Sequence, residues 1–317
     1  MFENSSALQL CPLSFLTVES APRLGTMSYP DSAIVGPSSL MANLPHGYKD
    51  TSNILKALQD NKENGNQYLV LLGLSKRDIE RLDDRGLSGL DYRFQLEGTV
   101  GLIKVVLSHA YDATTDLVTR TIDIYLIAMG IPLVDRQWAM STTYKPTASK
   151  GKQADQYFTP PCRSASPGQP IGWPTFVIET GVSESLPRLR EDAKWWFNNS
   201  GGEVRIVLVI GIRRTKVEFE LWELAPPNSP RPLTRGYIDS LRQRYLPPLV
   251  QQTAGSQQMY SHHKVEVTSS GVVGAPRVDN APMVLPFEAL YNRPPGVMEG
   301  DLVLGDQNFK DFVGTFL

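Results

Sequence analysis

The sequence predicts an α/β protein in which helices pack on one mixed β-sheet. Three observations carry this prediction: an alternating hairpin pattern at 92–107, two strongly apolar segments at 175–180 and 203–212, and amphipathic helical patterns between the strands. From about 90 to 224 the predicted order is strand, strand, helix, strand, strand, helix, strand, strand. An irregular arm is expected over 1–50, and a proline-broken C-terminal extension over 226–317 is expected to wrap the core.

The bulk composition limits the function classes. The chain has 317 residues, of which 41% are hydrophobic and 20% charged, which is ordinary for a globular protein. The formal net charge of −2 excludes a uniformly basic nucleic-acid binder, so any nucleic-acid contact must be a local patch. Two distant cysteines, Cys11 and Cys162, exclude a disulfide framework and a cysteine-rich zinc site.

The same features set an expected location. No stretch reaches the roughly 18 apolar residues that a membrane span needs. The N-terminal "MFENSSALQLCPLSFLTV" has no basic region before its apolar part, and Pro12 interrupts it, so we interpret it as not a secretory signal. We therefore expect an intracellular protein, cytoplasmic or nuclear, that does not act at a membrane.

The first regular elements are expected at 51–90, as two short helices that pack on the core. One is "SNILKALQDN", and the other begins after Ser75, which has Asp78 three residues later as in a capping box. A β-hairpin follows, since "YRFQLE" alternates apolar and polar residues, Glu97-Gly98 can turn, and "VGLIKVVL" returns.

A long helix is predicted at 110–129, ended by Gly130 and Pro132. Its predicted apolar face consists of Leu117, Ile124 and Met129, widened by Val118, Ile122, Tyr125 and Ile127. The segment "STTYKPTASKGKQADQYF" is expected to be extended, with a loop in its middle.

The second half of the core alternates strands and a helix. "TFVIET" and "EVRIVLVIGI" are apolar on both faces, which is typical of central strands. A helix at 185–197 is predicted to bury Leu186, Leu189, Ala193 and Trp196. "KVEFELWEL" alternates cleanly, which favours an edge strand, and "RGYIDSLRQRYLPPLV" favours a further helix.

Two carboxylates end neighbouring predicted strands. Asp155 lies in "KQADQYFTP", and Glu179 lies in "WPTFVIETGVSESLPRLREDAKWWF", which the strand "GGEVRIVLVIGI" follows. In order and spacing, residues 91–225 resemble the PD-(D/E)XK nuclease-like superfamily, and most closely its Uma2-like and related fungal members. The later "EGDLVL" is also similar to the tail of the fungal members.

The resemblance implies a restriction-endonuclease-like sheet and hydrolysis of nucleic-acid phosphodiesters. Asp155 and Glu179 would hold Mg²⁺ or Mn²⁺, and Asp112 falls where the family often adds an acid from the first helix. The chemistry is consistent, because a divalent ion polarises the phosphoryl group and activates water. Carboxylates at the ends of adjacent strands can converge on such an ion from a rigid platform.

The motif's lysine position is the main departure from that family. It falls on Gly181, so the cation must come from elsewhere. The candidates are Lys194 and Arg190 on the following helix and Lys152 before Asp155. Arginine can stabilise charge but cannot serve as an adjustable base.

An inactive nuclease-like scaffold is therefore the alternative. It would bind a nucleic acid, a protein partner or a second copy of the chain. An enzyme needs an open cavity beside the two acids, whereas acids closed off by ion pairs would leave only the fold. The basic cluster Arg213, Arg214 and Lys216 is either a charged turn or a phosphate contact, and Trp195 is either an exposed platform or covered.

A serine hydrolase is a minor alternative. "GVSES" follows a strand and precedes a helix, which would make Ser183 the nucleophile, with His262 or His263 later in the chain. The fifth motif position is Ser185 where such an elbow has glycine. No glycine-rich phosphate loop in a strand-to-helix setting is visible, so no small-molecule cofactor is expected.

Overall fold

The structure is a computed structural model that describes residues 67–83, 92–105, 109–140, 142–163, 172–182, 186–243, 257–269, 276–314 and 317. All of them fall within one unit of the chain, His46–Leu317. The predicted arm at 1–50 and the predicted helix at 52–61 lie outside the described residues.

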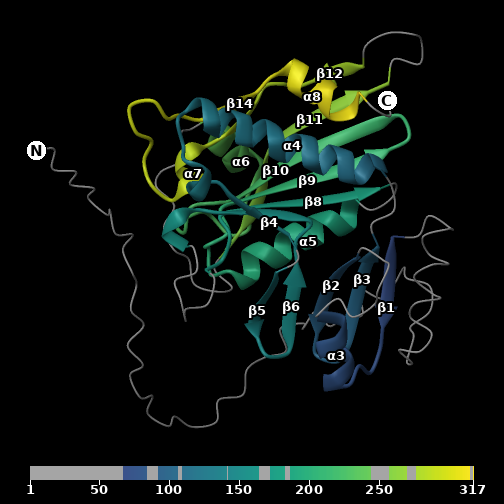
Figure 1. Ribbon diagram of the computed structural model, residues 1–317. Helices are drawn as coiled ribbons and strands as arrows, with labels where there is room; N and C mark the ends of the chain where they lie inside the picture. Colours follow the sequence, from purple (N-terminus) through teal and green to yellow (C-terminus); the bar gives the residue numbers. More distant parts are fainter. Residues whose placement is uncertain are drawn as a thin grey trace, which may run out of the picture. The chain divides into compact units, whose positions relative to one another are not determined.

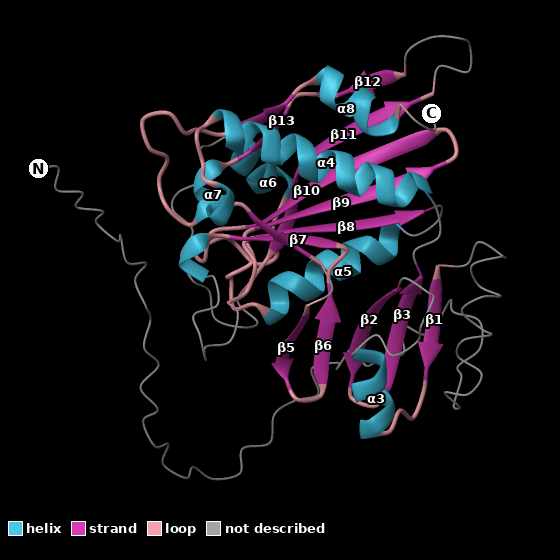
Figure 2. Cartoon of the chain, viewed as in Figure 1, coloured by secondary structure: helices cyan, strands magenta, loops and turns pink. Residues whose placement is uncertain are grey.

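The described part contains the following elements (Figures 1 and 2). The helices are α3 (Lys76–Asp83), α4 (His109–Ala128), η2 (Leu133–Asp135), η3 (Pro161–Arg163), α5 (Leu186–Asn199), α6 (Arg235–Arg242), α7 (Phe287–Tyr291) and α8 (Asp306–Val313). The strands are β1 (Tyr68–Leu71), β2 (Tyr92–Glu97), β3 (Val100–Val105), β4 (Gln137–Ala139), β5 (Thr143–Thr147), β6 (Lys150–Gln153), β7 (Gln156–Thr159), β8 (Phe176–Val182), β9 (Ile206–Arg213), β10 (Lys216–Leu224), β11 (Met259–Thr268), β12 (Arg277–Asp279), β13 (Met283–Leu285) and β14 (Leu302–Leu304).

The α/β class is confirmed, but the prediction of a single sheet is wrong. A seven-stranded sheet has the order β12-β11-β10-β9-β8-β7-β4, a five-stranded sheet has the order β1-β3-β2-β6-β5, and β13 pairs with β14. Strands β8 and β9 run parallel, and the other described pairs are antiparallel. Alternating apolar residues show that a segment is a strand but do not specify its partner, so the sequence could not separate the sheets.

The seven-stranded sheet is covered on both faces. Figure 1 shows α4 across one face and α5 across the other. On β9, Ile206, Leu208 and Ile210 pack in the core with α4, while Val207 and Val209 pack in the core with α5. Both faces of β9 are therefore apolar, as predicted for a central strand.

The five-stranded sheet has its own apolar core. The cluster contains Leu71, Phe94 and Ile103 from three neighbouring strands, together with Leu82 of α3. The hairpin β2–β3 is confirmed, and its turn places Gly98 at φ +63°, a backbone region that favours glycine.

Several local predictions are confirmed. The amide and hydroxyl of Ser75 both donate to the Asp78 carboxylate, and the Asp78 amide donates back to the Ser75 hydroxyl oxygen, which is the predicted capping box of α3. Helix α5 buries its four predicted apolar side chains. The segment 141–158 turns between β5 and β6, close to its middle.

The prediction that 216–224 forms an edge strand is wrong. Strand β10 lies between β9 and β11. The alternation itself is confirmed, since Val217 and Phe219 are buried in the core. The outward residues Glu218 and Glu220 are also buried, because Lys264 pairs with the first and Arg190 with the second. Because charged residues on one face of β10 are buried in ion pairs, this internal strand has the alternating sequence pattern of an edge strand.

The apolar face of α4 differs in part from the prediction. Val118, Ile122 and Leu126 are fully buried, four residues apart, against the seven-stranded sheet. Ile124 and Ile127 were predicted on this face, but they are 62% and 52% exposed. Apolar residues occur all round this helix, so its composition alone could not fix which side faces the sheet.

Alanine substitutions in α4 test this orientation. We expect Ile122→Ala to lower the free energy of unfolding by about 2–5 kcal/mol, because it leaves a cavity in the core. Ile124→Ala, the same change on the exposed side, should stay within about 0.5 kcal/mol of the wild type. Urea unfolding measures both, and equal losses at the two positions would contradict the orientation of the helix.

Candidate functional site

The two predicted acids face a common point. Asp155 and Glu179 are 2% and 1% exposed. The ammonium nitrogen Nζ of Lys104 lies 2.5 Å from Asp155 Oδ2 and 3.1 Å from Glu179 Oε2. The two carboxylates therefore belong to one site, and a lysine side chain lies between them.

Local chain geometry brings the acids together. After β6 the chain leaves the five-stranded sheet, and at β7 it enters the seven-stranded sheet, so Asp155 lies at the crossing. Strand β7 pairs with β8 with Gln156 opposite Ile178, which puts Asp155 beside Glu179. The amide of Thr180 donates to Asp155 Oδ2 at 2.8 Å and fixes the carboxylate in this position.

Cations from the five-stranded sheet reach the pair. Lys104 on β3 lies directly opposite Arg93 on β2. Arg93 Nε lies 3.7 Å from Asp155 Oδ1, and Arg93 Nη2 donates to the Asp155 carbonyl oxygen at 3.4 Å. This cross-strand pair of cations is buried, and it lies against a carboxylate from the neighbouring sheet.

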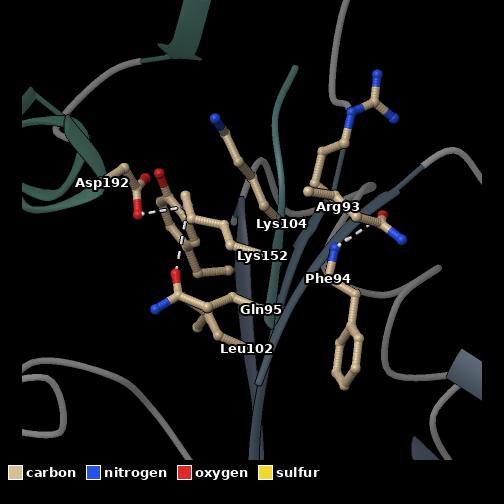
Figure 3. Close-up of a pocket in the computed structure, with 9 residues that line it drawn as sticks. Arg93, Phe94, Gln95, Leu102, Lys104, Lys152 and Asp192 are labelled. Carbon is tan, nitrogen blue, oxygen red and sulfur yellow. Dashed lines mark hydrogen bonds and ion pairs between the residues drawn. The ribbon is translucent and has the colours of Figure 1, made fainter. Parts of the chain in front are cut away.

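A third cation joins the network through helix α5. Lys152 Nζ lies 3.5 Å from Glu179 Oε1 and donates to Asp192 Oδ1 at 2.9 Å. It also donates to Gln95 Oε1, and Figure 3 shows it between Gln95 and Asp192. Arg188 donates to Asp192 as well, at 3.0 Å. Each carboxylate in the network thus has at least one cationic partner.

The indole of Trp196 completes the contacts of Glu179. Trp196 Nε1 donates to Glu179 Oε1 at 2.7 Å, and both side chains are buried. The predicted core position of Trp196 is therefore confirmed, and its polar atom serves the site. Trp195, the other member of the pair, is 8% exposed and packs on Trp173 and Trp196, so it is covered.

Burial and charge set the protonation of the site. Burial disfavours the charge on Lys104, but Asp155, Tyr111 and Glu179 together outweigh this effect and raise the lysine pKa well above its ordinary value. Burial also opposes ionisation of Asp155, and Lys104 with Arg93 overcomes it, so its pKa is lowered. For Glu179 burial prevails over Lys152 and Lys104, and its pKa is raised.

The other predicted site residues lie elsewhere. Lys194 pairs with Glu191 at 3.6 Å and is half-exposed. Arg190 donates to both carboxylate oxygens of Glu220, at 2.9 and 2.6 Å. Asp112 lies in the first turn of α4 and is exposed. Of the three cations named from the sequence, Lys152 is the one that contacts the acids.

Sequence reasoning missed Lys104, Arg93 and Asp192. A signal for them exists, because each is a charged residue inside a buried pattern. Lys104 interrupts the apolar "VGLIKVV", and Arg93 lies inside "YRFQL". Asp192 lies beside Ala193 on the buried side of α5. Isolated charges at such positions need partners, since burying an unpaired charge costs several kcal/mol.

The residues do not fit a divalent ion in this arrangement. Among the described residues, no group of three or more His, Cys, Asp or Glu side chains could hold a metal ion. The network contains one more cation than carboxylates: Arg93, Lys104, Lys152 and Arg188 against Asp155, Glu179 and Asp192. An added dication would meet the Lys104 ammonium at the point that both acids face.

The space beside the network is also small. A hollow lined by Tyr68, Arg93, Gln95, Lys104, Lys152 and Asp192, among others, leaves a volume of about 10 Å³ for the centre of a water molecule. One water needs roughly 10–15 Å³ by this measure. Figure 3 shows the side chains that line it. Asp155 and Glu179 do not line this hollow, and at 2% and 1% exposure they are closed to a nucleic-acid phosphate in this arrangement.

The structure bears on one of two further hypotheses from the sequence, the basic cluster, but not on the other, the serine hydrolase. Ser183, the nucleophile of the serine-hydrolase hypothesis, lies outside the described residues. In the basic cluster, Arg213 pairs with Glu218 and Lys216 with Glu218 and Glu266. Carboxylates already compensate these two cations, which favours the charged turn over a phosphate contact.

Glu223 on β10 is a further buried carboxyl group with an altered pKa. Its Oε2 accepts a hydrogen bond from the Tyr260 hydroxyl at 3.2 Å and lies 3.4 Å from His262 Nδ1. Burial raises the pKa of Glu223 to about 7 and lowers the pKa of His262 to about 4. Both side chains are therefore held neutral near pH 6.

Comparison with known proteins finds no family model and no curated protein that matches this chain. Within the described residues, none of the helices combines the length and the apolar character needed to cross a membrane.

Removing the central cation tests the network. Lys104→Met keeps the aliphatic stem but leaves two buried carboxylates without their nearest cation, so we expect a loss of about 3–5 kcal/mol in unfolding free energy. The loss should shrink at acidic pH, where the carboxylates are protonated. Lys150→Met, which removes an exposed pair with Glu97, should cost less than about 1 kcal/mol. Urea unfolding at several pH values measures this, and similar losses for both variants would contradict it.

Glu223 should make stability depend on pH. Its folded pKa lies above the unfolded value of 4.5, so the folded state retains a proton that the unfolded state releases between pH 4.5 and about 7. Its stabilising contribution is thus present below pH 4.5 and is lost as the pH rises, by about 3 kcal/mol in all. In Glu223→Gln this component should vanish while the opposite contribution of His262 remains. Parallel pH profiles of unfolding free energy for the two proteins would contradict this assignment.

Proposed function

We propose that this chain is a nuclease-like module that acts by binding another protein and does not hydrolyse phosphodiesters. The order α4, Asp155 just before β7, β8 with Glu179, α5 and then β9 parallel to β8 supports the nuclease-like relationship. The single observation that argues against hydrolysis is the ammonium group of Lys104 between the two acids.

The position of Lys104 removes what hydrolysis requires. A metal-dependent nuclease needs carboxylates that are free to share a divalent ion and open to a phosphate. Here the acids are 2% and 1% exposed and compensated by cations from the five-stranded sheet. The neighbouring hollow holds about one water. These features support a role for the acids in joining the two sheets.

The exposed surface supports a protein partner over a nucleic acid. Ile124, Ile127, Leu133 and Val134 are 62%, 52%, 74% and 71% exposed, and they lie within eleven consecutive residues at the end of α4 and in η2. Contiguous exposed apolar patches are typical of protein-binding surfaces, and we infer such a patch from these four residues. The net charge of −2 and the paired cations of the β9–β10 turn give no comparable support for binding a phosphate backbone.

Metal-dependent phosphodiester hydrolysis is the second candidate. The convergence of Asp155 and Glu179 on one cation favours it, because that is the arrangement in which two carboxylates share an ion. For this function the side chain of Lys104 would have to withdraw from its present place. The cleavage assay below separates the two candidates.

A cleavage assay with supercoiled plasmid and single-stranded RNA is the direct test. With Mg²⁺ or Mn²⁺, we expect the wild-type chain to nick no faster than the Asp155→Asn and Glu179→Gln variants, because its acids are bound to lysines. Divalent-dependent nicking that both substitutions abolish would overturn the proposal and establish the second candidate.

A second experiment tests whether the exposed apolar residues bind a protein partner. Leu133→Asp with Val134→Asp should remove cross-linked protein partners that the wild type retains in extracts of its source cells. Val297→Asp, on another fully exposed apolar side chain, is the matched control and should retain them. Salt-sensitive binding to labelled DNA or RNA, unaffected by these substitutions, would instead identify a nucleic-acid module.

A further inference from the structure

We propose that Lys104 takes the cation position defined by Asp155 and Glu179, and that this side chain keeps divalent ions out of the intact chain. The inference rests on the proposed function, in which the acids do not serve catalysis. It also makes a separate claim. The two acids are already arranged to bind a cation, but the Lys104 side chain fills the space that another cation would need.

The position of the ammonium group supports this assignment. Its nitrogen is 2.5 Å from Asp155 Oδ2 and 3.1 Å from Glu179 Oε2. Metal ions bind carboxylate oxygens at about 2.0–2.6 Å. The ammonium nitrogen is within this range of Asp155 Oδ2 and farther, at 3.1 Å, from Glu179 Oε2, so an ion shared by the two acids would lie close to it and slightly nearer Glu179. Asp155 and Glu179 also accept hydrogen bonds from Thr180 and Trp196, which belong to the seven-stranded sheet and α5 and do not depend on Lys104.

The surroundings hold Lys104 in place. Lys104 is 4% exposed, and its ammonium group lies 5.7 Å from the centre of the Tyr111 ring. Its strand β3 pairs on both sides, with β1 and β2. Strand pairing therefore fixes the backbone of Lys104, and the two carboxylates hold its buried ammonium group in place.

Charge explains the exclusion, and the space and oxygens that Lys104 leaves behind explain the expected effect of removing it. With Lys104 present, the network already has one more cation than carboxylates. Without Lys104 the two acids lose their shared cation, while Lys152 keeps its closer partner Asp192 at 2.9 Å. The space vacated by the lysine side chain then offers two carboxylate oxygens and room for water, which are the ligands that Mn²⁺ and Mg²⁺ take.

The test is Mn²⁺ binding, measured by titration calorimetry and by electron paramagnetic resonance of the free ion. We expect no saturable site in the wild type or in Lys150→Ala, which removes an exposed lysine of the β6 hairpin. Lys104→Ala should bind one Mn²⁺ per chain, and adding Glu179→Gln should weaken this by at least about tenfold. These outcomes together support the proposal.

Two results would overturn it. In one, the wild type binds one Mn²⁺ that Glu179→Gln removes, so the lysine does not exclude the ion. In the other, a folded Lys104→Ala chain binds none, so the acids do not form a cation site. If Lys104→Ala does not fold, as judged by circular dichroism with and without Mn²⁺, Lys104→Gln takes its place with the same two outcomes.

Measuring Mn²⁺ binding and cleavage together separates the failure of this inference from the failure of the proposed function. A wild type that neither binds Mn²⁺ nor cleaves, beside a Lys104→Ala chain that stays metal-free, would overturn the inference and leave the proposed function standing. Cleavage by the wild type would overturn the proposed function whatever the calorimetry gives for Lys104→Ala.

Discussion

The structure depends on a buried contact between charges of two sheets. The chain passes from the five-stranded to the seven-stranded sheet at Asp155, and Lys104 of the first sheet binds Asp155 and Glu179 of the second. Charges removed from water cost several kcal/mol each unless they are paired and hydrogen-bonded. The side chains around this contact extend the same compensation: Arg93 lies 3.7 Å from Asp155 Oδ1, and Lys152 and Trp196 both face Glu179 Oε1.

The same contact links the fold to the proposed function. A sheet with two acids on adjacent strands is a platform for metal chemistry when the acids face a cleft. In this chain a second sheet lies against the acids, and its cations complete the electrostatic balance. Whether such a site does chemistry depends on what lies opposite the acids. Acids that are opposed by lysines from a packed sheet stabilise the fold, whereas acids that face solvent bind ions and substrates.

The sequence allowed much of the local structure to be predicted. Ser75 and Asp78 form their cap, β2 and β3 form their hairpin, and α5 buries its predicted face, because each depends on residues close in the chain. Asp155 and Glu179 were found for a similar reason, since each lies in or beside a recognisable strand, although Glu179 lies inside β8 and not at its end as predicted. Lys194 and Arg190 were chosen by sequence spacing from Glu179, but they have nearer carboxylates of their own in Glu191 and Glu220.

What the sequence alone determined is the α/β class, the position of most elements and the identity of the two acids, because hydrophobic periodicity and turn residues act over short distances. Only the tertiary structure decided that the strands form separate sheets, that β10 is internal, and that Lys104 lies between the acids. The physical reason is that strand pairing and charge partners join residues far apart in the chain. Lys104 and Glu179 are 75 positions apart, and no local pattern records which buried cation meets which buried carboxylate.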